Sequence, residues 1–277
     1  MCHSSNGTGE TMNLQTSWKL PKQRPRPRWG ARSAVAVLLV SLLATPVGAL
    51  RAEDSEKGFT PLFNGRSLDG WKGNPDLWSV VDGAIRGQTS DDKPLKRNEF
   101  LIWDGRAADF VLRLEFRIAD RGVGNSGVQY RSKVYTDEGP WVVGGYQADI
   151  ERTNKYMGIL YEERGRGILA LRGQEVALNR DGDKLVKEVV GSTGDEMELV
   201  QGVKANEWQT LEVTARGNRL EHKLNGRTLV RVVDNDSKEM AKSGVIALQL
   251  HVGAEMQIDF RNIRLRNERL EAIGDKP

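Results

Sequence analysis

Three short segments of this chain carry Glu, Arg, Gln and Asp at alternate positions. They span residues 110–118, 126–131 and 145–150. Bidentate donors and acceptors of these types suit the neighbouring hydroxyl groups of a sugar ring. The small residues Asn125, Ser126 and Gly127 leave room beside them. The pattern therefore indicates a sugar-binding surface. The alternative is a solvated sheet face with cross-strand charge pairs worth ~0.2–1 kcal/mol each, and the pattern alone does not decide between them.

The same segments alternate apolar and polar residues, which is the period-2 signature of a sheet with two different faces. The apolar face holds Phe110, Leu112, Leu114, Phe116, Ile118, Val128, Tyr130, Tyr146, Ala148 and Ile150. The polar face holds Arg113, Glu115, Arg117, Gln129, Arg131, Gln147, Asp149 and Glu151. Tyr130 and Tyr146 are thus predicted to lie in the core rather than to bind a ligand.

The rest of the mature chain reads as further short strands joined by Gly-rich turns. We expect strands at 78–81, 84–87, 99–103, 158–161, 168–171, 208–216, 219–224, 228–233, 244–252 and 255–264. Residues 179–195 are predicted to form a long loop and residues 235–242 a short helix. We find no heptads, no βαβ alternation and no repeat of 20–50 residues. The fold class is therefore all-β, with antiparallel sheets packed as a sandwich or jelly roll rather than a parallel sheet.

Residues 1–49 have the three parts of a secretory signal peptide. A basic region precedes an apolar run at 34–44, and small residues at 47–49 offer a cleavage site. That run is short of the ~20 residues that span a bilayer, so we expect cleavage and a periplasmic or secreted protein rather than a stable membrane span. The start codon is Met1 or Met12. We divide the remainder into a linker (50–57), one domain (58–267) and a C-terminal tail (268–277).

Charge and cysteine usage exclude several function classes. The leader takes six of the 41 basic residues and one of the 38 acidic ones, which leaves 35 against 37 and a net charge of −2. The mature chain therefore has no basic patch that favours nucleic acid. The single cysteine, Cys2, lies in the leader, so the exported chain has neither disulfides nor thiol chemistry.

Seven motifs resemble, in order, those of the 3-keto-disaccharide hydrolase domain family, which adopts a concanavalin-A-like jelly roll. They are LFNGRSLDGW, FVLRLEFR, NSGVQYR, GYQADI, GILYEERGRG, LNG and the closing GVIALQLH with IDFRNIRLR. The resemblance covers essentially all of residues 58–267. It implies an exported enzyme that acts on glycosides whose sugar is oxidised to a ketone at carbon 3.

The chemistry implied by this resemblance is an elimination. The ketone acidifies the C2 proton, a base removes it, and the C1 leaving group departs from the enediolate before water adds. Such a site needs a base, an oxyanion donor and an acid. We assign Glu115 or Asp149 as base, Arg131 with Arg117 as oxyanion donors, and His251 and Gln147 as groups that bind or protonate sugar oxygens. The remaining substrate-binding candidates are Asn125, Gln129, Trp141, Glu163, Arg166 and Gln249.

Each assignment has an alternative. Glu115 and Arg117 also suit a cross-strand ion pair, and His251 and Trp141 also suit structural roles. Asp149 also suits a divalent cation such as calcium, because jelly rolls of this type hold cations through oxygen ligands. The chain has no HxH or HExxH motif and no complete dinucleotide fingerprint. A redox cofactor is therefore expected on a partner oxidoreductase that makes the 3-keto sugar.

Two function classes remain, because a fold does not fix a function. The first is an enzyme that cleaves 3-keto-glycosides. The second is a non-catalytic carbohydrate-binding module on the same scaffold. Release of a chromogenic leaving group from a 3-keto-glucoside separates them, since a module binds without release.

Overall fold

A computed structural model describes residues 57–122, 124–253 and 255–268. The predicted leader at 1–49, most of the linker and residues 269–277 of the predicted tail lie outside the described residues. No helix in the described part is long and apolar enough to cross a membrane.

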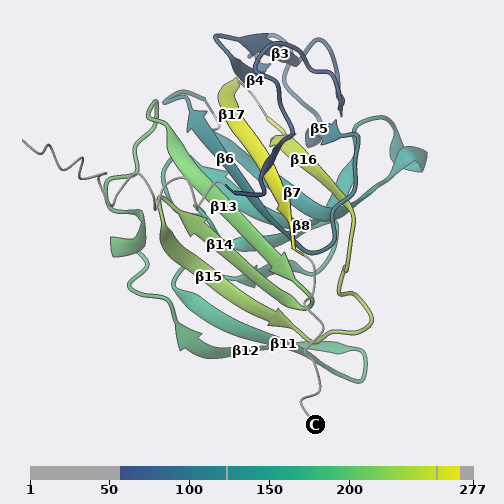
Figure 1. Cartoon of the computed structure of the whole chain (residues 1–277), viewed down its shortest axis with the longest axis vertical. Coiled ribbons are helices and arrows are strands. Elements are labelled where there is room, and N and C mark those ends of the chain that lie inside the picture. Colours follow the sequence, from purple (N-terminus) through teal and green to yellow (C-terminus); the bar gives the residue numbers. More distant parts are fainter. Residues whose placement is uncertain (1–56, 123, 254, 269–277) are drawn as a thin grey trace, which may run out of the picture. The chain divides into compact units, whose positions relative to one another are not determined.

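The larger sheet has ten strands and fills the front of Figure 1. Its order is β12-β11-β15-β14-β13-β6-β17-β4-β3, with β1 paired to β17. Every pairing is antiparallel except that of β11 with β15, which is parallel. The strands are β1 (Thr60–Pro61), β3 (Trp78–Val81), β4 (Ala84–Thr89), β6 (Phe110–Ile118), β11 (Gln174–Asp181), β12 (Lys184–Ser192), β13 (Gln209–Arg216), β14 (Arg219–Leu224), β15 (Arg227–Asp234) and β17 (Met256–Asn267).

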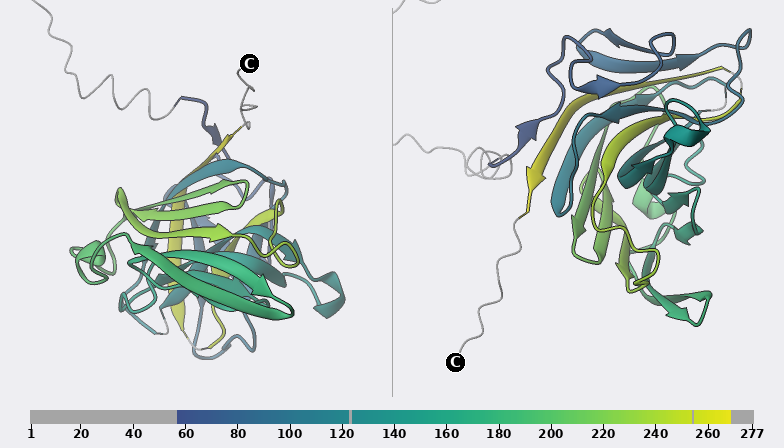
Figure 2. Two further views of the ribbon diagram at one scale, coloured as in Figure 1. Left: turned by 90° about the horizontal axis from the view of Figure 1, so that it is seen from below. Right: turned by 90° about the vertical axis from the view of Figure 1, so that its right-hand side faces the viewer.

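The smaller sheet has seven strands in the order β10-β9-β8-β7-β16-β5-β2. They are β2 (Trp71–Lys72), β5 (Glu99–Trp103), β7 (Asn125–Val134), β8 (Val143–Glu151), β9 (Leu160–Glu163), β10 (Gly167–Ala170) and β16 (Val245–Leu250). Two short 3-10 helices lie at Thr136–Glu138 and Glu198–Val200. The views of Figure 2 show the two sheets as stacked layers, with β17 curving along its length. The predicted all-β sandwich is confirmed.

The main core fills the space between the two sheets. Leu112, Leu114 and Phe116 of β6 belong to the same buried cluster as Val128 of β7 and Ile150 of β8. Burial of such side chains contributes about 1.5–3 kcal/mol each, and alternation therefore fixes which face of each strand turns inward.

Tyrosine hydroxyls provide polar links between the sheets inside this core. Tyr130 and Tyr146 are fully buried, as predicted. The Tyr130 hydroxyl lies 2.8 Å from His222 Nε2, and the Tyr146 hydroxyl donates to Asp234 Oδ2 over 2.6 Å. Because a buried hydroxyl without a partner is costly, these bonds stabilise the alignment of the two layers.

Two expectations from the sequence are wrong. Residues 179–195 are not a long loop, because β11 and β12 pair as an edge hairpin. Most of β12 is exposed, so it lacks the alternation that marks a half-buried strand. Residues 235–242 form turns rather than a helix. The last two expected strands are present and lie in different sheets, β16 in the smaller one and β17 in the larger one.

Candidate active site

A pocket of about 280 Å³ opens on the outer face of the smaller sheet, over β7, β8, β9 and the end of β16. Its lining collects six of the predicted site residues from segments far apart in the chain. They are Asn125, Gln147, Asp149, Glu163, Gln249 and His251. Asn98, Tyr156, Ile159, Tyr161 and Ile168 complete the lining. A polar pocket with convergent side chains is a candidate binding or catalytic site.

Gly127 provides the space for this convergence. It lies opposite Asp149 on the neighbouring strand, and a Cβ atom built on it would meet Gln147 Cδ at 2.5 Å. The side chain of Gln147 therefore lies across the backbone of Gly127. This close approach brings the Gln147 amide to Asp149.

A directed chain of hydrogen bonds orients the floor of the pocket. Ser132 Oγ donates to Gln129 Oε1 over 2.7 Å, and Gln129 Nε2 donates to Gln147 Oε1 over 2.8 Å. Gln147 Nε2 then donates to Asp149 Oδ1 over 2.7 Å. Since each amide accepts at oxygen and donates at nitrogen, the chain fixes Gln147 with its N–H directed at the carboxylate. Gln129 is fully buried and so acts beneath the pocket rather than in its lining.

The Asp149 carboxyl is 8% exposed and carries the most strongly raised carboxyl pKa in the pocket. Burial raises this pKa from 3.8 to about 7, with Glu163 and Glu151 adding to the rise while the Gln147 hydrogen bond opposes it. The lining of the pocket includes neither Lys nor Arg, and burial next to like charges is what raises a carboxyl pKa. A carboxylate with a pKa near neutrality is suited to general-base catalysis.

Glu163 lies across the same pocket on β9. Both of its carboxylate oxygens accept from Asn98 Nδ2 at 3.2 Å, and Asn98 Oδ1 in turn accepts from the Val252 backbone N–H at 2.8 Å. Burial raises the pKa of Glu163, although Asn98 and His251 oppose the rise. Burial, Glu163 and Asp149 also raise the pKa of Tyr161, which therefore stays a neutral hydroxyl donor at neutral pH.

His251 follows the last residue of β16 and is half-buried. Its Nδ1 lies 2.7 Å from the Val252 carbonyl oxygen. Because a carbonyl only accepts, Nδ1 carries the proton in this contact. Nε2 is then the ring nitrogen that this contact leaves available, and imidazole is the commonest side chain in general acid–base catalysis.

A calcium site at Asp149 stays a prediction. Within the described residues, no group of three or more His, Cys, Asp or Glu side chains is arranged to hold a metal ion. Calcium binds six to eight oxygens, and Asp149 has an amide rather than a second carboxylate as its hydrogen-bond partner. We therefore derive no step through a metal.

Glu115 and Arg117 do not reach this pocket, since their strand, β6, belongs to the other sheet. Arg261 Nη2 lies 2.7 Å from Glu115 Oε2, and Asn262 also donates to that carboxylate. Arg117 is paired with Asp259 at 2.8 Å. The assignment of Glu115 as an alternative base and of Arg117 as an oxyanion donor is therefore wrong, because both side chains lie on the other sheet. Alternation predicts which side chains lie on the outer face of a strand, but not the sheet to which the strand belongs.

Arg131 lies near the pocket in sequence but its side chain, 1% exposed, points elsewhere. The β7–β8 register shifts between Tyr130 and Lys133, and Arg131 has a φ of +48° at this bulge. Its guanidinium binds Asp109 Oδ1 at 2.8 Å and donates to the carbonyls of Ala108 and Gly217. The predicted oxyanion donor is therefore a structural cation.

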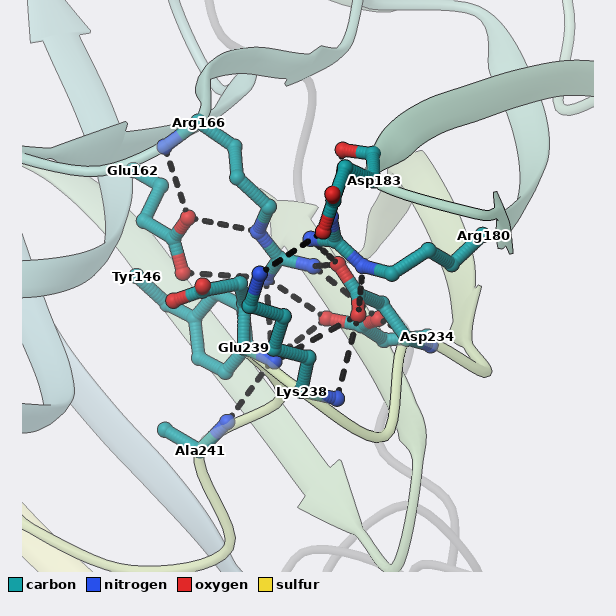
Figure 3. A network of polar contacts seen from close by, with 10 residues as sticks. Tyr146, Glu162, Arg166, Arg180, Asp183, Asp234, Lys238, Glu239 and Ala241 are labelled. Atoms are coloured by element: carbon teal, nitrogen blue, oxygen red, sulfur yellow. Dashed lines mark hydrogen bonds and ion pairs between the residues drawn. The ribbon is translucent and has the colours of Figure 1, made fainter.

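Arg166 was also predicted to face the substrate, and it lies instead in a buried ionic network, drawn in Figure 3. Its guanidinium is held by Glu162 at 2.6 Å, by Asp234 at 2.7 Å and by Asp236 at 3.3 Å. Arg180 holds Asp236 at 2.6 Å. The network ties the β9–β10 hairpin, which carries Tyr161 and Glu163, to the edge of the larger sheet.

Trp141 lies outside the pocket and lines a separate groove on the same sheet. Conversely, the sequence analysis missed Asn98, Tyr156, Ile159 and Ile168. Asn98 and Tyr156 lie in connections between strands, where no periodic pattern marks a side chain. Ile159 and Ile168 were expected only as parts of strands. Tyr161, two residues before the predicted Glu163, also lines the pocket.

Comparisons with known proteins identify the family and the fold of this chain. The model of the 3-keto-alpha-glucoside-1,2-lyase-like domain matches residues 58–266. A 3-keto-disaccharide hydrolase from Bacteroides thetaiotaomicron is 26% identical over 105 residues, which cover 35% of this chain and 36% of that protein. The match thus spans about a third of that relative's length.

Two solved structures share the fold. A candidate glycosyl hydrolase from Parabacteroides distasonis has a TM-score of 0.50 at 17% identity, covering 78% of this chain and 97% of its own. A Bacillus subtilis protein of unknown function with a galectin-like fold has a TM-score of 0.50 at 12% identity, covering 76% and 94%. At these identities the likeness concerns the jelly-roll fold alone.

Proposed function

The chain belongs to the 3-keto-alpha-glucoside-1,2-lyase-like family, and on that premise we propose that it cleaves 3-keto-glycosides by elimination, with Asp149 as the base. The observation that carries the proposal is a buried carboxyl with a pKa of about 7 in a polar pocket whose lining includes neither Lys nor Arg. The name of the Bacteroides relative, a 3-keto-disaccharide hydrolase, supports the same substrate class.

In the first step Asp149 takes the proton from C2 of the 3-keto sugar. The electron pair of the C2–H bond forms a C2–C3 double bond, and the ketone oxygen becomes an enediolate oxygen. Asp149 Oδ1 already accepts from Gln147, so we assign Oδ2 as the proton acceptor. The neutral Tyr161 hydroxyl and the Gln249 amide are the donors of the lining that suit the developing negative charge.

In the second step the C1–O bond breaks as the enediolate re-forms the ketone and a C1–C2 double bond. The leaving oxygen takes a proton, which we assign to His251 Nε2, with Glu163 stabilising the imidazolium. Addition of water across the C1–C2 double bond returns the proton to C2 and completes a net hydrolysis. Each step conserves charge, and neither needs an oxidant within the site. An oxidoreductase that supplies the 3-keto sugar is the implied partner.

The decisive experiment uses 3-keto-glucosides with a chromogenic leaving group, one carrying hydrogen and one deuterium at C2. Wild type is expected to release the chromophore with a primary isotope effect. Asp149→Asn is expected to lower kcat by roughly 10²–10⁴-fold, the usual contribution of a general base. Release without an isotope effect in wild type, or with full activity in Asp149→Asn, contradicts the assignment.

The same experiment addresses the carbohydrate-binding module. If wild type binds the 3-keto-glucoside saturably but releases no chromophore, the protein is a carbohydrate-binding module rather than an enzyme. Glu163→Gln and His251→Ala provide the matched variants, because each changes one polar group of the lining. We expect both to slow release less than Asp149→Asn does, since each assists only the departure of the leaving group.

Export of the chain is a separate part of the proposal. It is supported by the order of a basic region, an apolar run and small residues within residues 1–49. N-terminal sequencing of the protein recovered from the periplasm or medium is expected to find a start close to residue 50. Recovery of the intact leader in the cytoplasm would contradict export.

A further inference from the structure

The larger sheet ends in an exposed edge strand, β12, which has no part in the proposed reaction. Among the described strands β12 pairs only with β11, and Figure 1 shows it at the lower end of that sheet. Most of its side chains are exposed, including Val186, Val189 and Val190. An open edge of this kind is a template for pairing with another strand.

The contacts of β11 show which backbone groups of β12 face outwards. The Asn235 N–H donates to the Leu178 carbonyl over 2.8 Å, so Leu178 directs its backbone groups towards the β15 side. Leu178 lies opposite Lys187 of β12, and these two residues therefore form a non-hydrogen-bonded pair. Because the two kinds of pair alternate along an antiparallel ladder, Leu185 and Lys187 direct their N–H and C=O groups to the free edge.

The side chains on one face of β12 carry opposite charges on either side of a valine. Lys184, Val186 and Glu188 share that face, and all three are exposed. Within the described residues, neither Lys184 nor Glu188 forms an ion pair. Lys187 lies on the opposite face, and its ammonium donates to the Ile168 carbonyl of the smaller sheet. It therefore does not block the edge, as a lysine at such a position commonly does.

We infer that β12 is a dimerisation edge, which pairs antiparallel with β12 of a second copy of this chain and has Val186 on the two-fold axis. In an isologous interface each contact occurs twice, so Lys184 of each copy lies opposite Glu188 of the other. Leu185 of one copy and Lys187 of the other exchange backbone hydrogen bonds, which uses the groups that these residues direct outwards. The two larger sheets then continue as one sheet across the axis.

The charges select this register over the others that pair a similar length of β12. With Lys187 or Glu188 on the axis, like charges lie directly opposite one another, which is destabilising. With Val189 or Val190 on the axis, no opposite charges meet. The β11–β12 ladder also has a bulge at Val190, where the strand twists more strongly, and this bulge lies outside the paired segment 184–188.

Sedimentation velocity of the purified protein over a wide range of concentrations tests the pairing. Wild type is expected to show a monomer–dimer equilibrium. Lys184→Glu and Glu188→Lys should each raise the dimer Kd about tenfold, because each variant places like charges opposite one another twice. The double variant should restore the wild-type Kd, since opposite charges meet again. Lys204→Glu is the matched control, because it makes the same charge change at a 70% exposed side chain outside β12, and it should leave the Kd unchanged.

Wild type that stays monomeric at every concentration overturns the proposal. A double variant that dimerises no more tightly than the single variants also overturns it. Neither result is expected to result from misfolding, because the two side chains are exposed and form no ion pair within the described residues.

Disulfide trapping in a Cys2→Ser background tests the register independently. On the axis, the Cα atoms of Val186 and its copy form a non-hydrogen-bonded pair about 4.5 Å apart, which a disulfide can bridge. Val186→Cys should therefore form covalent dimers under mild oxidation. Val190→Cys is the control, because Val190 is 57% exposed against 37% for Val186 but lies away from its own copy in this register. Equal or faster trapping of Val190→Cys overturns the proposed pairing.

Discussion

Two sets of carboxylates within this domain have opposite surroundings. Asp149 and Glu163 face a pocket, and their hydrogen-bond partners are the amides of Gln147 and Asn98. Asp234, Asp236 and Glu162 face the guanidinium of Arg166. Burial raises the pKa of Asp149 to about 7, whereas the hydrogen bond from Arg180 lowers that of Asp236 to about 2.

This contrast separates a site from a structural link. A carboxylate that is paired with arginine stays ionised over the physiological range and stabilises the fold. A carboxylate buried among amides keeps a proton available near neutral pH, at a cost to stability. The following variants test whether that distinction holds, beginning with the largest expected effect.

Removal of the central cation should damage the structural set most. In Arg166→Met the carboxylates of Glu162, Asp234 and Asp236 lose their shared partner. Breaking a buried pair in this way destabilises by about 3–5 kcal/mol, which urea denaturation measures. The control is Arg231→Met, since Arg231 is 52% exposed where it pairs with Glu175 and Glu221 and should contribute at most about 1 kcal/mol. Equal losses of stability in the two variants would contradict the structural role of the buried Arg166 network.

Removal of the charge of Asp149 should stabilise the fold, whereas removal of Arg166 should destabilise it. The pKa of Asp149 is raised on folding, so its contribution to stability is fully present below about pH 4 and is lost as the pH rises through about 7. Asp149→Asn abolishes this loss. We therefore expect it to raise the free energy of unfolding by on the order of 1–3 kcal/mol at pH 8 and to have little effect at pH 4. A destabilised Asp149→Asn at pH 8 would contradict the raised pKa.

A weaker effect is expected when the hydrogen bond from Gln147 to Asp149 is removed, because this bond opposes the rise in the pKa of Asp149. Gln147→Met removes the amide that lowers the pKa of Asp149, so the acid limb of the pH dependence of kcat/KM should move to higher pH. Loss of one such bond corresponds to about fivefold lower kcat/KM at pH 6. Ser132→Ala, two bonds further along the chain, should shift the limb less. A shift to lower pH in Gln147→Met would refute the direction of the hydrogen bond.

The smallest effect is expected on the other sheet. Glu115→Gln removes a carboxylate whose ion pair with Arg261 lies partly exposed on the outer face. Stability should change by at most about 1 kcal/mol, and chromophore release from the 3-keto-glucoside should stay within about twofold of wild type. A loss as large as that of Asp149→Asn would return Glu115 to the catalytic site.

The sequence predicted the bounds of the strands better than it predicted which strands lie next to one another. The bounds of β3, β5, β6 and β14 are those expected from the sequence. In β6 the pattern is clearest, because one buried face imposes a period of two. The same pattern gives Glu115 and Asp149 equivalent positions on their strands. Only the strand order, which long-range packing decides, places them on different sheets.

Other site residues were hidden for local reasons. Arg131 has the parity of a surface residue, but the bulge after Tyr130 turns its side chain inward. Asn98 lies just before β5, and its role depends on a hydrogen bond from Val252, which is 154 residues away. Neither a bulge nor such a contact leaves a periodic signal in the sequence.

The most direct test of the account is a titration of the Asp149 carboxyl carbon by NMR, in protein labelled with carbon-13 at aspartate and assigned by comparison with Asp149→Asn. The account predicts a midpoint of about pH 7. A midpoint below pH 5 would mean that Asp149 is an ordinary stabilised carboxylate, and the pocket would then hold no base poised for the proposed elimination.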